Sequence, residues 1–245
     1  MDNNCREEEK RTALLLGMAA LEKLHRAHIA VFGVGGVGGY VCEALARAGV
    51  GAMTIIDADT VSLSNINRQL VALHSTVGRL KVDVMRERIL DINPDCRVTT
   101  VPRFYLPEEA ADFPLDGYDY VVDAIDTVKA KIDLAVRATK GGVRFLSAMG
   151  AGNKLSPAGF VVTDLSKTAG CPLARVMRVE LRRRGIRHLK VAYSCETASG
   201  YAPDAPEADR KGTAGRPAPG SLPYVPGAEG LLIASAVVEE LIAAE

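Results

Sequence analysis

A run of glycines between two apolar segments places the strongest constraint on how this chain of 245 residues can fold. Residues 28–32 form a short apolar run that predicts a buried strand, and residues 39–48 carry apolar side chains at helical spacing. The glycines between them are Gly33, Gly35, Gly36 and Gly38. They allow a tight turn, and the free N–H groups at the start of the helix favour an anion. The pattern therefore predicts a nucleotide-binding loop, in preference to a turn that only packs the helix on the strand.

Strand-like and helix-like segments alternate through the first part of the chain. This alternation predicts right-handed strand–helix–strand units, and hence an α/β fold with a doubly wound, mostly parallel, Rossmann-like sheet. The predicted strands are 28–32, 52–56, 97–101, 118–122, 143–148, 159–163 and 189–193. The predicted helices are 12–25, 39–48, 79–91, 128–139, 172–184 and 229–244.

The length suits one large α/β domain or two small ones, and the whole chain, 1–245, is predicted to form a single domain. After about residue 150 the pattern changes to a basic helical and strand segment, followed by a stretch rich in Pro, Gly and Ala that predicts a mobile loop. The expected parts are an N-terminal helical segment (1–27), a nucleotide-binding core (28–165), a basic segment (166–199), a flexible loop (200–220) and a closing strand and helix (221–245).

Composition excludes several classes of protein. The 30 basic and 30 acidic residues balance, so only a local patch could attract nucleic acid. No apolar run is long enough for a transmembrane helix, and the polar N-terminus does not resemble a signal peptide, so no membrane partner is expected. The five cysteines form no Cys-x-x-Cys pair, which argues against a tetracysteine zinc site. Their odd number and the lack of a signal peptide predict reduced thiols in a cytoplasmic protein.

A polar run after the second strand favours ATP over NAD as the nucleotide. Asp57 directly follows the strand 52–56, where a carboxylate can bind a ribose hydroxyl. Basic side chains downstream could neutralise charge on a leaving pyrophosphate, which a dehydrogenase does not need. Taken alone, the run is better explained as a solvated loop, and it is the glycine loop beside it that makes a nucleotide site the favoured interpretation. The candidate residues in and after it are Asp57, Asp59, Asn65, Arg68, Gln69 and Lys81.

Two aspartates follow the predicted strand 118–122. Ligands bind at the carboxyl ends of strands in doubly wound folds, and carboxylate oxygens suit Mg²⁺. We expect Asp126 to bind Mg²⁺. Asp123 could support the loop or the metal. For this residue, capping the helix 128–139 and acting as a ligand are about equally favoured, and Thr127 is a competing cap.

Basic residues cluster between 175 and 190, where Glu180 is the one acid. The spacing of Arg175, Arg178 and Arg182 predicts one helical face. Such a stripe suits a phosphate backbone, although a solvated helix face is the ordinary explanation for a charge run. The candidate nucleic-acid-binding residues are Arg175, Arg178, Arg182, Arg183, Arg184, Arg187 and Lys190.

These motifs, in this order, resemble the adenylating family of enzymes that are similar to ubiquitin-activating enzymes. Within it, the chain is similar to the branch that dehydrates N6-threonylcarbamoyladenosine in tRNA. The segments that carry the resemblance are 11–17 (RTALLLG), 67–78 (NRQLVALHSTVG), 91–95 (DINPD), 118–127 (YDYVVDAIDT), 150–154 (GAGNK) and 171–178 (CPLARVMR).

The resemblance implies roles for individual residues. Gly35, Gly36 and Gly38 match the phosphate loop, and Asp57 matches the acid that binds ribose. Asn65, Arg68 and Lys81 match the polar residues around the triphosphate. Asp126 matches the aspartate that binds Mg²⁺. Arg11 is similar to an arginine that reaches the partner subunit's ATP, which makes Arg68, Lys81, Asp126 and Arg11 the expected catalytic residues of a homodimer.

The activity that the resemblance implies is ATP-dependent: AMP is transferred to the threonyl carboxylate, and cyclisation then removes water. Three alternatives stay open. They are activation of the C-terminus of a ubiquitin-like sulfur-carrier protein, an NAD-dependent dehydrogenase, and a nucleotide-dependent scaffold for a sulfur-transfer system such as a cysteine desulfurase with its sulfur acceptor. No zinc tetracysteine, catalytic cysteine or proton relay is recognisable to support the first two.

Overall fold

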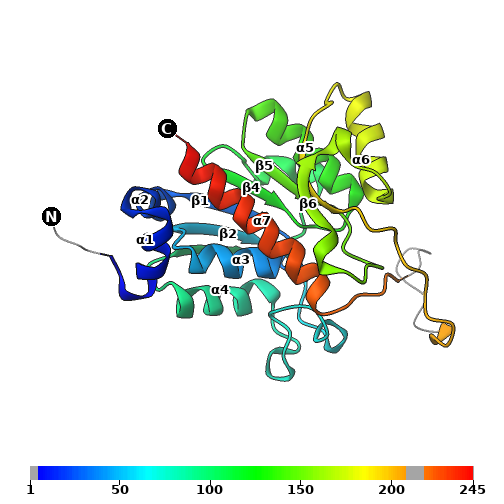
Figure 1. Ribbon diagram of the computed structural model, residues 1–245, viewed down its shortest axis with the longest axis horizontal. Coiled ribbons are helices and arrows are strands. Elements are labelled where there is room, and N and C mark those ends of the chain that lie inside the picture. Colours follow the sequence, from blue (N-terminus) through cyan, green and yellow to red (C-terminus); the bar gives the residue numbers. More distant parts are fainter. Residues whose placement is uncertain (1–4, 208–217, 245) are drawn as a thin grey trace.

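The computed structural model describes residues 5–207 and 218–244, and these form a seven-stranded sheet covered by helices on both faces (Figure 1). The strand order is β3-β2-β1-β4-β5-β7-β6, and only β6 runs antiparallel to its neighbour. The predicted α/β class with a doubly wound, mostly parallel sheet is therefore confirmed. The strands are β1 (His28–Phe32), β2 (Ala52–Ile56), β3 (Arg97–Val101), β4 (Tyr120–Asp123), β5 (Phe145–Ala148), β6 (Phe160–Asp164) and β7 (Lys190–Ser194).

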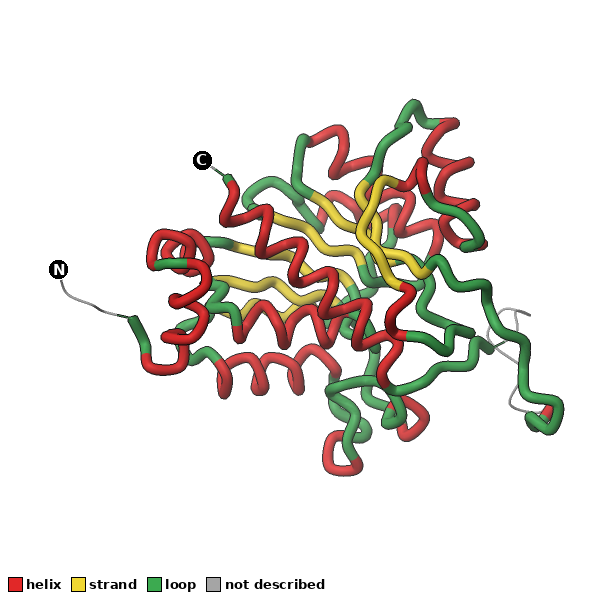
Figure 2. The backbone as a smooth tube through the Cα atoms, in the orientation of Figure 1, coloured by secondary structure: helices red, strands yellow, loops and turns green. Residues whose placement is uncertain are grey.

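The helices pack on the sheet in two layers. The α-helices are α1 (Lys10–Leu16), α2 (Met18–Arg26), α3 (Gly38–Arg47), α4 (Lys81–Ile92), α5 (Val128–Gly141), α6 (Pro172–Arg183) and α7 (Tyr224–Ala243). Short 3-10 turns are η1 (Glu7–Glu9), η2 (Leu63–Asn65), η3 (His74–Thr76), η4 (Pro107–Asp112), η5 (Pro157–Gly159) and η6 (Leu165–Lys167). The longest loops lie at the end of the sheet away from α1 and α2 (Figure 2).

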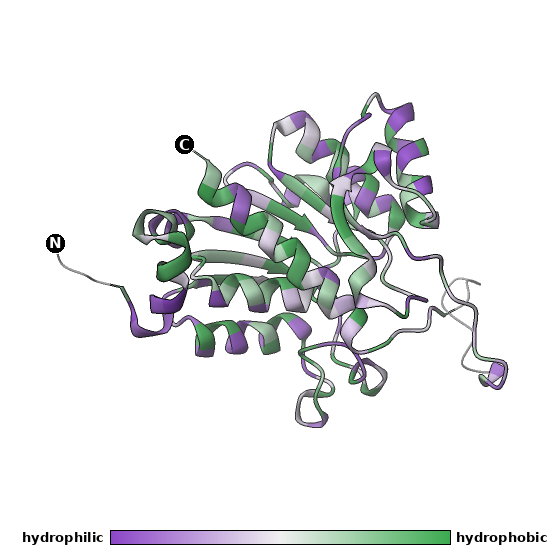
Figure 3. Cartoon of the chain, viewed as in Figure 1, coloured by the Kyte–Doolittle hydropathy of each residue, from purple (hydrophilic) through white to green (hydrophobic). Residues whose placement is uncertain are grey.

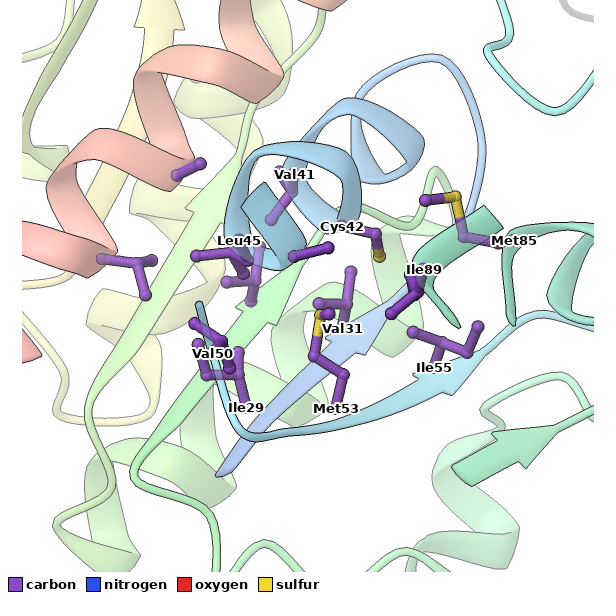
Figure 4. Close-up of a cluster of buried hydrophobic side chains, with 14 of the residues drawn as sticks. Ile29, Val31, Val41, Cys42, Leu45, Val50, Met53, Ile55, Met85 and Ile89 are labelled. Atoms are coloured by element: carbon purple, nitrogen blue, oxygen red, sulfur yellow. The ribbon is translucent and has the colours of Figure 1, made fainter. Parts of the chain in front are cut away.

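Alternate residues of each strand feed two separate cores. Ile29 and Val31 of β1 point to the layer of α2, α3, α4 and α7, whereas Ala30 and Phe32 point to the layer of α5 and α6. Figure 4 shows the first of these cores, in which Leu45 of α3 and other apolar helix residues face the strands. Because both faces are covered, the central strands are mostly apolar and almost completely buried.

The structure differs from the sequence prediction at three elements. The helix expected over 12–25 is two helices, because Gly17 has φ +80° and interrupts it. The closing helix begins at Tyr224, before its expected start, and Pro226 is tolerated in its first turn. The strand expected after residue 221 is absent from the described part of that segment. Of the predicted mobile loop 200–220, residues 208–217 lie outside the described residues.

None of the helices in the described residues has the length and apolar character needed to span a lipid bilayer.

Candidate active site

The glycine loop, defined as residues 33–38, lies where the strand order reverses between β1 and β4. The last residue of β1, Phe32, is in register with the last residue of each neighbouring strand, Ile56 of β2 and Asp123 of β4. The residues that follow these three strands therefore meet at one edge of the sheet. Doubly wound folds bind ligands in the crevice at such a switch point.

Two of the loop's glycines are required by close backbone contacts. A Cβ atom on Gly38 would lie 1.8 Å from the carbonyl oxygen of Gly33, and one on Gly33 would lie 2.7 Å from that of Ala124. Gly33 also has φ +92°, which L side chains rarely adopt. The loop is thus packed tightly against the turn that follows β4.

The loop leaves a group of backbone donors unpaired. Among the described residues, the N–H groups of Gly35, Gly36, Val37 and Gly38 donate no backbone or side-chain hydrogen bond within the chain. They stand at the start of α3, where the helix dipole adds partial positive charge. This arrangement can bind a phosphate.

Asp57 lies beside this loop, where a ribose acid was expected. Its Oδ2 accepts the Val34 N–H at 2.7 Å and its Oδ1 accepts the Asp59 N–H at 2.8 Å. Each carboxylate oxygen has a second lone pair, so Asp57 can hold the glycine loop and still accept a ribose hydroxyl.

The side chain of Gln69 is buried beside the glycine loop. A Cβ atom on Gly35 would lie 3.8 Å from Gln69 Nε2. Gln69 Oε1 is buried and has no hydrogen-bond partner among the described residues. Because an unpaired buried acceptor costs free energy, this amide is suited to a ligand that donates to it.

Arg68 and Asn65 are partly exposed in the same segment. Arg68 donates to the Ser64 carbonyl oxygen at 3.1 Å and to Asn67 Oδ1 at 2.9 Å. Asn65 Oδ1 accepts the Ser62 N–H at 3.1 Å, so its carboxamide holds the turn. Arg68 has further N–H donors that an anion could use.

Lys81 is buried at the start of α4 and forms an ion pair with Asp59. Its Nζ lies 2.7 Å from Asp59 Oδ2, and its backbone N–H donates to the Asp59 carbonyl oxygen at 3.0 Å. The structure therefore brings two predicted site residues together as partners. Asp59 is half exposed, so the pair is open to a competing anion.

Asp126 is exposed just beyond β4. Its one hydrogen bond among the described residues is a long one from Thr127 Oγ1, at 3.4 Å. No three His, Cys, Asp or Glu side chains in the described ranges are grouped to hold a metal by themselves. A lone free carboxylate fits Mg²⁺, which usually binds one or two carboxylates together with phosphates and water.

The capping role considered for Asp123 was wrong, whereas its support of the loop after β4 is confirmed, since it accepts the Ile125 N–H at 3.2 Å. It is completely buried and forms an ion pair with Lys131, with 3.0 Å between Lys131 Nζ and Asp123 Oδ2. Ser147 also donates to this carboxylate at 2.6 Å. Lys131 was not recognised in the sequence, although it is a buried residue in the first turn of α5.

Glu229 is a second buried acid that the sequence did not single out. It stands in the apolar part of α7, and neither of its carboxylate oxygens is hydrogen-bonded among the described residues. Burial raises the pKa of Glu229 to about 8, although Lys131 opposes the rise. The Met149 N–H opposes the rise in the pKa of Glu229 as well. The hydrogen bond of this N–H goes to the Ala192 carbonyl oxygen, at 2.8 Å.

Arg11 is not brought to the glycine loop of its own chain. It lies on α1, which follows η1, and Glu9 of η1 packs against Gly49 at the opposite edge of the sheet. Figure 1 shows α1 at that end of the molecule.

The basic segment divides into engaged and free side chains. Arg178 lies on the same side of α6 as Arg175 and Arg182, but its guanidinium is engaged within the chain, since it donates to the Thr168 carbonyl oxygen at 2.9 Å. Arg183 and Arg184 pair with Glu180, and Lys190 pairs with Glu240. Arg175, Arg182 and Arg187 are exposed and have no acidic partner in the part of the chain that is described.

Comparison with known proteins identifies the family to which the chain belongs. The model of the ThiF family matches residues 9–242. The chain is 41% identical over 237 residues to the tRNA threonylcarbamoyladenosine dehydratase of Bacillus subtilis, covering 95% of this chain and 93% of that protein. A Saccharomyces cerevisiae adenylyltransferase and sulfurtransferase is 35% identical over 138 residues, covering 56% of this chain and 31% of that protein.

A solved structure agrees with the sequence comparison. The crystal structure of the Escherichia coli tRNA N6-threonylcarbamoyladenosine dehydratase in complex with ATP superposes with a TM-score of 0.86 at 36% identity. The match covers 97% of this chain and 95% of the other.

Proposed function

The chain belongs to the ThiF family, and we propose that it is an ATP-dependent enzyme that dehydrates N6-threonylcarbamoyladenosine in tRNA. The observation that carries the proposal is the similarity over nearly the whole chain to a dehydratase of known structure that binds ATP. The unpaired N–H groups of the glycine loop supply a matching phosphate site in this chain.

The reaction follows from the poor reactivity of a free carboxylate. An oxygen of the threonyl carboxylate attacks the α-phosphorus of ATP, and pyrophosphate leaves. A nitrogen or oxygen of the same modified nucleoside then attacks the activated carbonyl carbon, and AMP leaves with the original carboxylate oxygen. The net change is cyclisation with loss of one water, and no protein nucleophile is needed.

The task of the protein is then positional and electrostatic. The glycine loop holds the phosphates, and Asp57 and Gln69 hold the nucleoside part. Arg68 and Lys81 neutralise the departing pyrophosphate, with Lys81 exchanging Asp59 for the anion. Asn65 shapes the turn that carries Arg68.

Asp126 is the residue proposed to bind Mg²⁺. Its exposed carboxylate beside the glycine loop supports this assignment. Bound there, Mg²⁺ would offset phosphate charge.

For tRNA, we propose contact through Arg175, Arg182 and Arg187. Two open hollows of about 670 and 480 Å³ flank α6, and Arg178 and Val179 line both. Val176 and Val179 are exposed between the free arginines, so unpaired bases and phosphates could both be accommodated. Figure 3 shows this mixture of hydrophilic and hydrophobic residues along α6.

The proposed assembly is a homodimer in which Arg11 reaches the partner's ATP. It is supported by Leu14 and Leu15 of α1, which are 85% and 87% exposed next to Arg11. Adjacent large apolar side chains of this kind are typical of protein interfaces. The proposed location is the cytoplasm, where a tRNA substrate is available.

Activation of a sulfur-carrier protein is not favoured. The comparison with the yeast adenylyltransferase and sulfurtransferase covers little more than half of this chain. Of the cysteines, Cys42, Cys96 and Cys171 are buried, and burial raises the pKa of the Cys96 thiol to about 11. A cysteine desulfurase and its sulfur acceptor enter the proposal only as binding partners, since dehydration transfers no sulfur.

The test is to incubate the protein with ATP, Mg²⁺ and tRNA containing the modified adenosine, and to measure the mass of the released nucleosides. Loss of one water from the modified nucleoside, with one AMP formed per product, is expected. Activity with a sulfur-carrier protein instead of tRNA would contradict the proposal.

A further inference from the structure

Two oppositely charged side chains are completely buried beneath the turn that carries Asp126. Lys131 Nζ lies 3.0 Å from both carboxylate oxygens of Asp123. A buried ion pair is weak evidence for stability, because desolvation offsets much of the attraction, and apolar replacements of similar size are often tolerated. Its presence calls for a second explanation, and its hydrogen bonds supply one.

The pair holds both ends of one short turn. Lys131 Nζ donates to the Ile125 carbonyl oxygen at 3.1 Å, and the Ile125 N–H donates to Asp123 Oδ1 at 3.2 Å. The backbone on both sides of the Ile125 side chain is therefore tied to the buried pair. Asp126 is the next residue, and its carboxylate is free.

The same turn packs directly against the glycine loop. The Ala124 carbonyl oxygen is the atom that a Cβ on Gly33 would meet at 2.7 Å, and the Ala124 N–H donates to the Phe32 carbonyl oxygen at 2.8 Å. The hydrogen bond from Lys131 to the Ile125 carbonyl oxygen therefore helps to fix the backbone that positions Asp126 relative to the glycine loop.

We propose that Lys131, through its ion pair with Asp123 and its hydrogen bond to Ile125, is a positioning residue that holds Asp126 in place to bind Mg²⁺ on the nucleotide. The expected effect on Mg²⁺ binding rests on the proposed function, whereas the contacts of Lys131 with Asp123 and Ile125 do not. Lys131 touches neither the substrate nor the crevice, since it is completely buried.

The test uses a double variant, Asp123→Asn/Lys131→Met, because Lys131→Met alone would leave a buried carboxylate without its partner. The asparagine keeps an acceptor for the Ile125 N–H and for Ser147, whereas the methionine loses the bond to the Ile125 carbonyl oxygen. Ser147→Ala is the matched control, because it removes a hydrogen bond to Asp123 but leaves Lys131 and the turn joined.

ATP affinity is measured by calorimetry with and without Mg²⁺. In the double variant, affinity without Mg²⁺ should stay within about threefold of the unaltered protein, whereas the factor by which Mg²⁺ tightens binding should fall about tenfold. Adding Asp126→Asn should cause no further loss, because both changes act on one metal ligand. Tightening that survives in the folded double variant, or losses that simply add, would overturn the proposal.

Amide hydrogen exchange provides a readout that does not depend on the nucleotide. The Ile125 and Asp126 amides should exchange about tenfold faster or more in the double variant, with α3 unchanged. Unchanged exchange would reject the positioning role. If the unaltered protein bound no ATP, or if Mg²⁺ gave no tightening, the function or the metal role would fail, while exchange would still decide whether Lys131 holds the turn.

Discussion

Glu229 shows how strongly burial can alter a single residue. Its pKa is raised to about 8 by desolvation, against an ordinary value of 4.5, and the charge of Lys131 only partly opposes the rise. The carboxyl group is therefore mostly protonated at neutral pH. Each unit of pKa corresponds to about 1.4 kcal/mol, so ionising Glu229 costs several kcal/mol more in the folded state than in the unfolded chain.

This pKa predicts a pH dependence of stability. Between about pH 5 and pH 8 the folded state retains a proton that the unfolded state releases, so this group lowers the free energy of unfolding as pH rises, and the loss levels off above pH 8. Glu229→Gln should remove this component and be the more stable protein at pH 8.5. Urea unfolding of both proteins from pH 5 to 9 measures it. Parallel curves for the two proteins would contradict the raised pKa.

Asp126 leads to a different kind of prediction, because it is exposed and forms no ion pair among the described residues. Asp126→Asn should lower Mg²⁺-dependent turnover by about 100-fold or more, as removal of one group that stabilises developing charge commonly does. The melting temperature should not change, since the side chain is not buried. Asp116→Asn, at another exposed position, is the control and should retain full activity. Equal activity of the two variants would exclude Asp126 from the site.

At the level of single elements, α6 combines two functions along its length. Its inner residues Ala174, Met177 and Leu181 are buried against the α5 layer. Its arginines are not equivalent, because some hold neighbouring backbone or Glu180 and others are free. A charge run in a sequence therefore overestimates the number of residues available to a partner.

The free arginines of the basic segment should control salt-dependent tRNA binding. Arg175→Gln/Arg182→Gln/Arg187→Gln should weaken binding and make the slope of log K against log salt shallower by about 2 to 3, since each lost phosphate contact contributes about 0.7 to 0.9. Arg183→Gln/Arg184→Gln is the matched control, because these residues already pair with Glu180. Filter binding over a range of salt concentrations measures both. An unchanged slope in the triple variant would assign α6 an ordinary solvated face.

At the scale of the whole molecule, the parts proposed to act together lie at opposite ends of the sheet. The glycine loop follows the carboxyl end of β1, whereas α1 lies at the amino ends of the strands with Arg11, Leu14 and Leu15. In this structure one chain does not bring them together. A second copy could, which is why the proposed site is shared between subunits.

Mixing two inactive variants tests this arrangement. If Arg11 acts across the dimer, Arg11→Ala and Asp126→Asn should each be inactive alone. Random exchange of subunits would make half of the dimers mixed, and each mixed dimer would have one intact site of two. The mixture should therefore recover about one quarter of the original activity. Absence of recovery, with subunit exchange verified by mass, would place Arg11 outside the partner's site.

Short-range patterns in the sequence were enough to predict the fold class, the strand positions and the glycine loop. Those features depend on apolar periodicity and on backbone freedom at Gly33 and Gly38, which are local properties of the chain. Tertiary structure alone decided which groups meet: Lys131 with Asp123, Lys81 with Asp59, and Arg178 with the Thr168 carbonyl oxygen. It also buried Glu229 without a hydrogen-bond partner among the described residues. Burial and pairing depend on which elements pack together, and spacing along the chain does not carry that information.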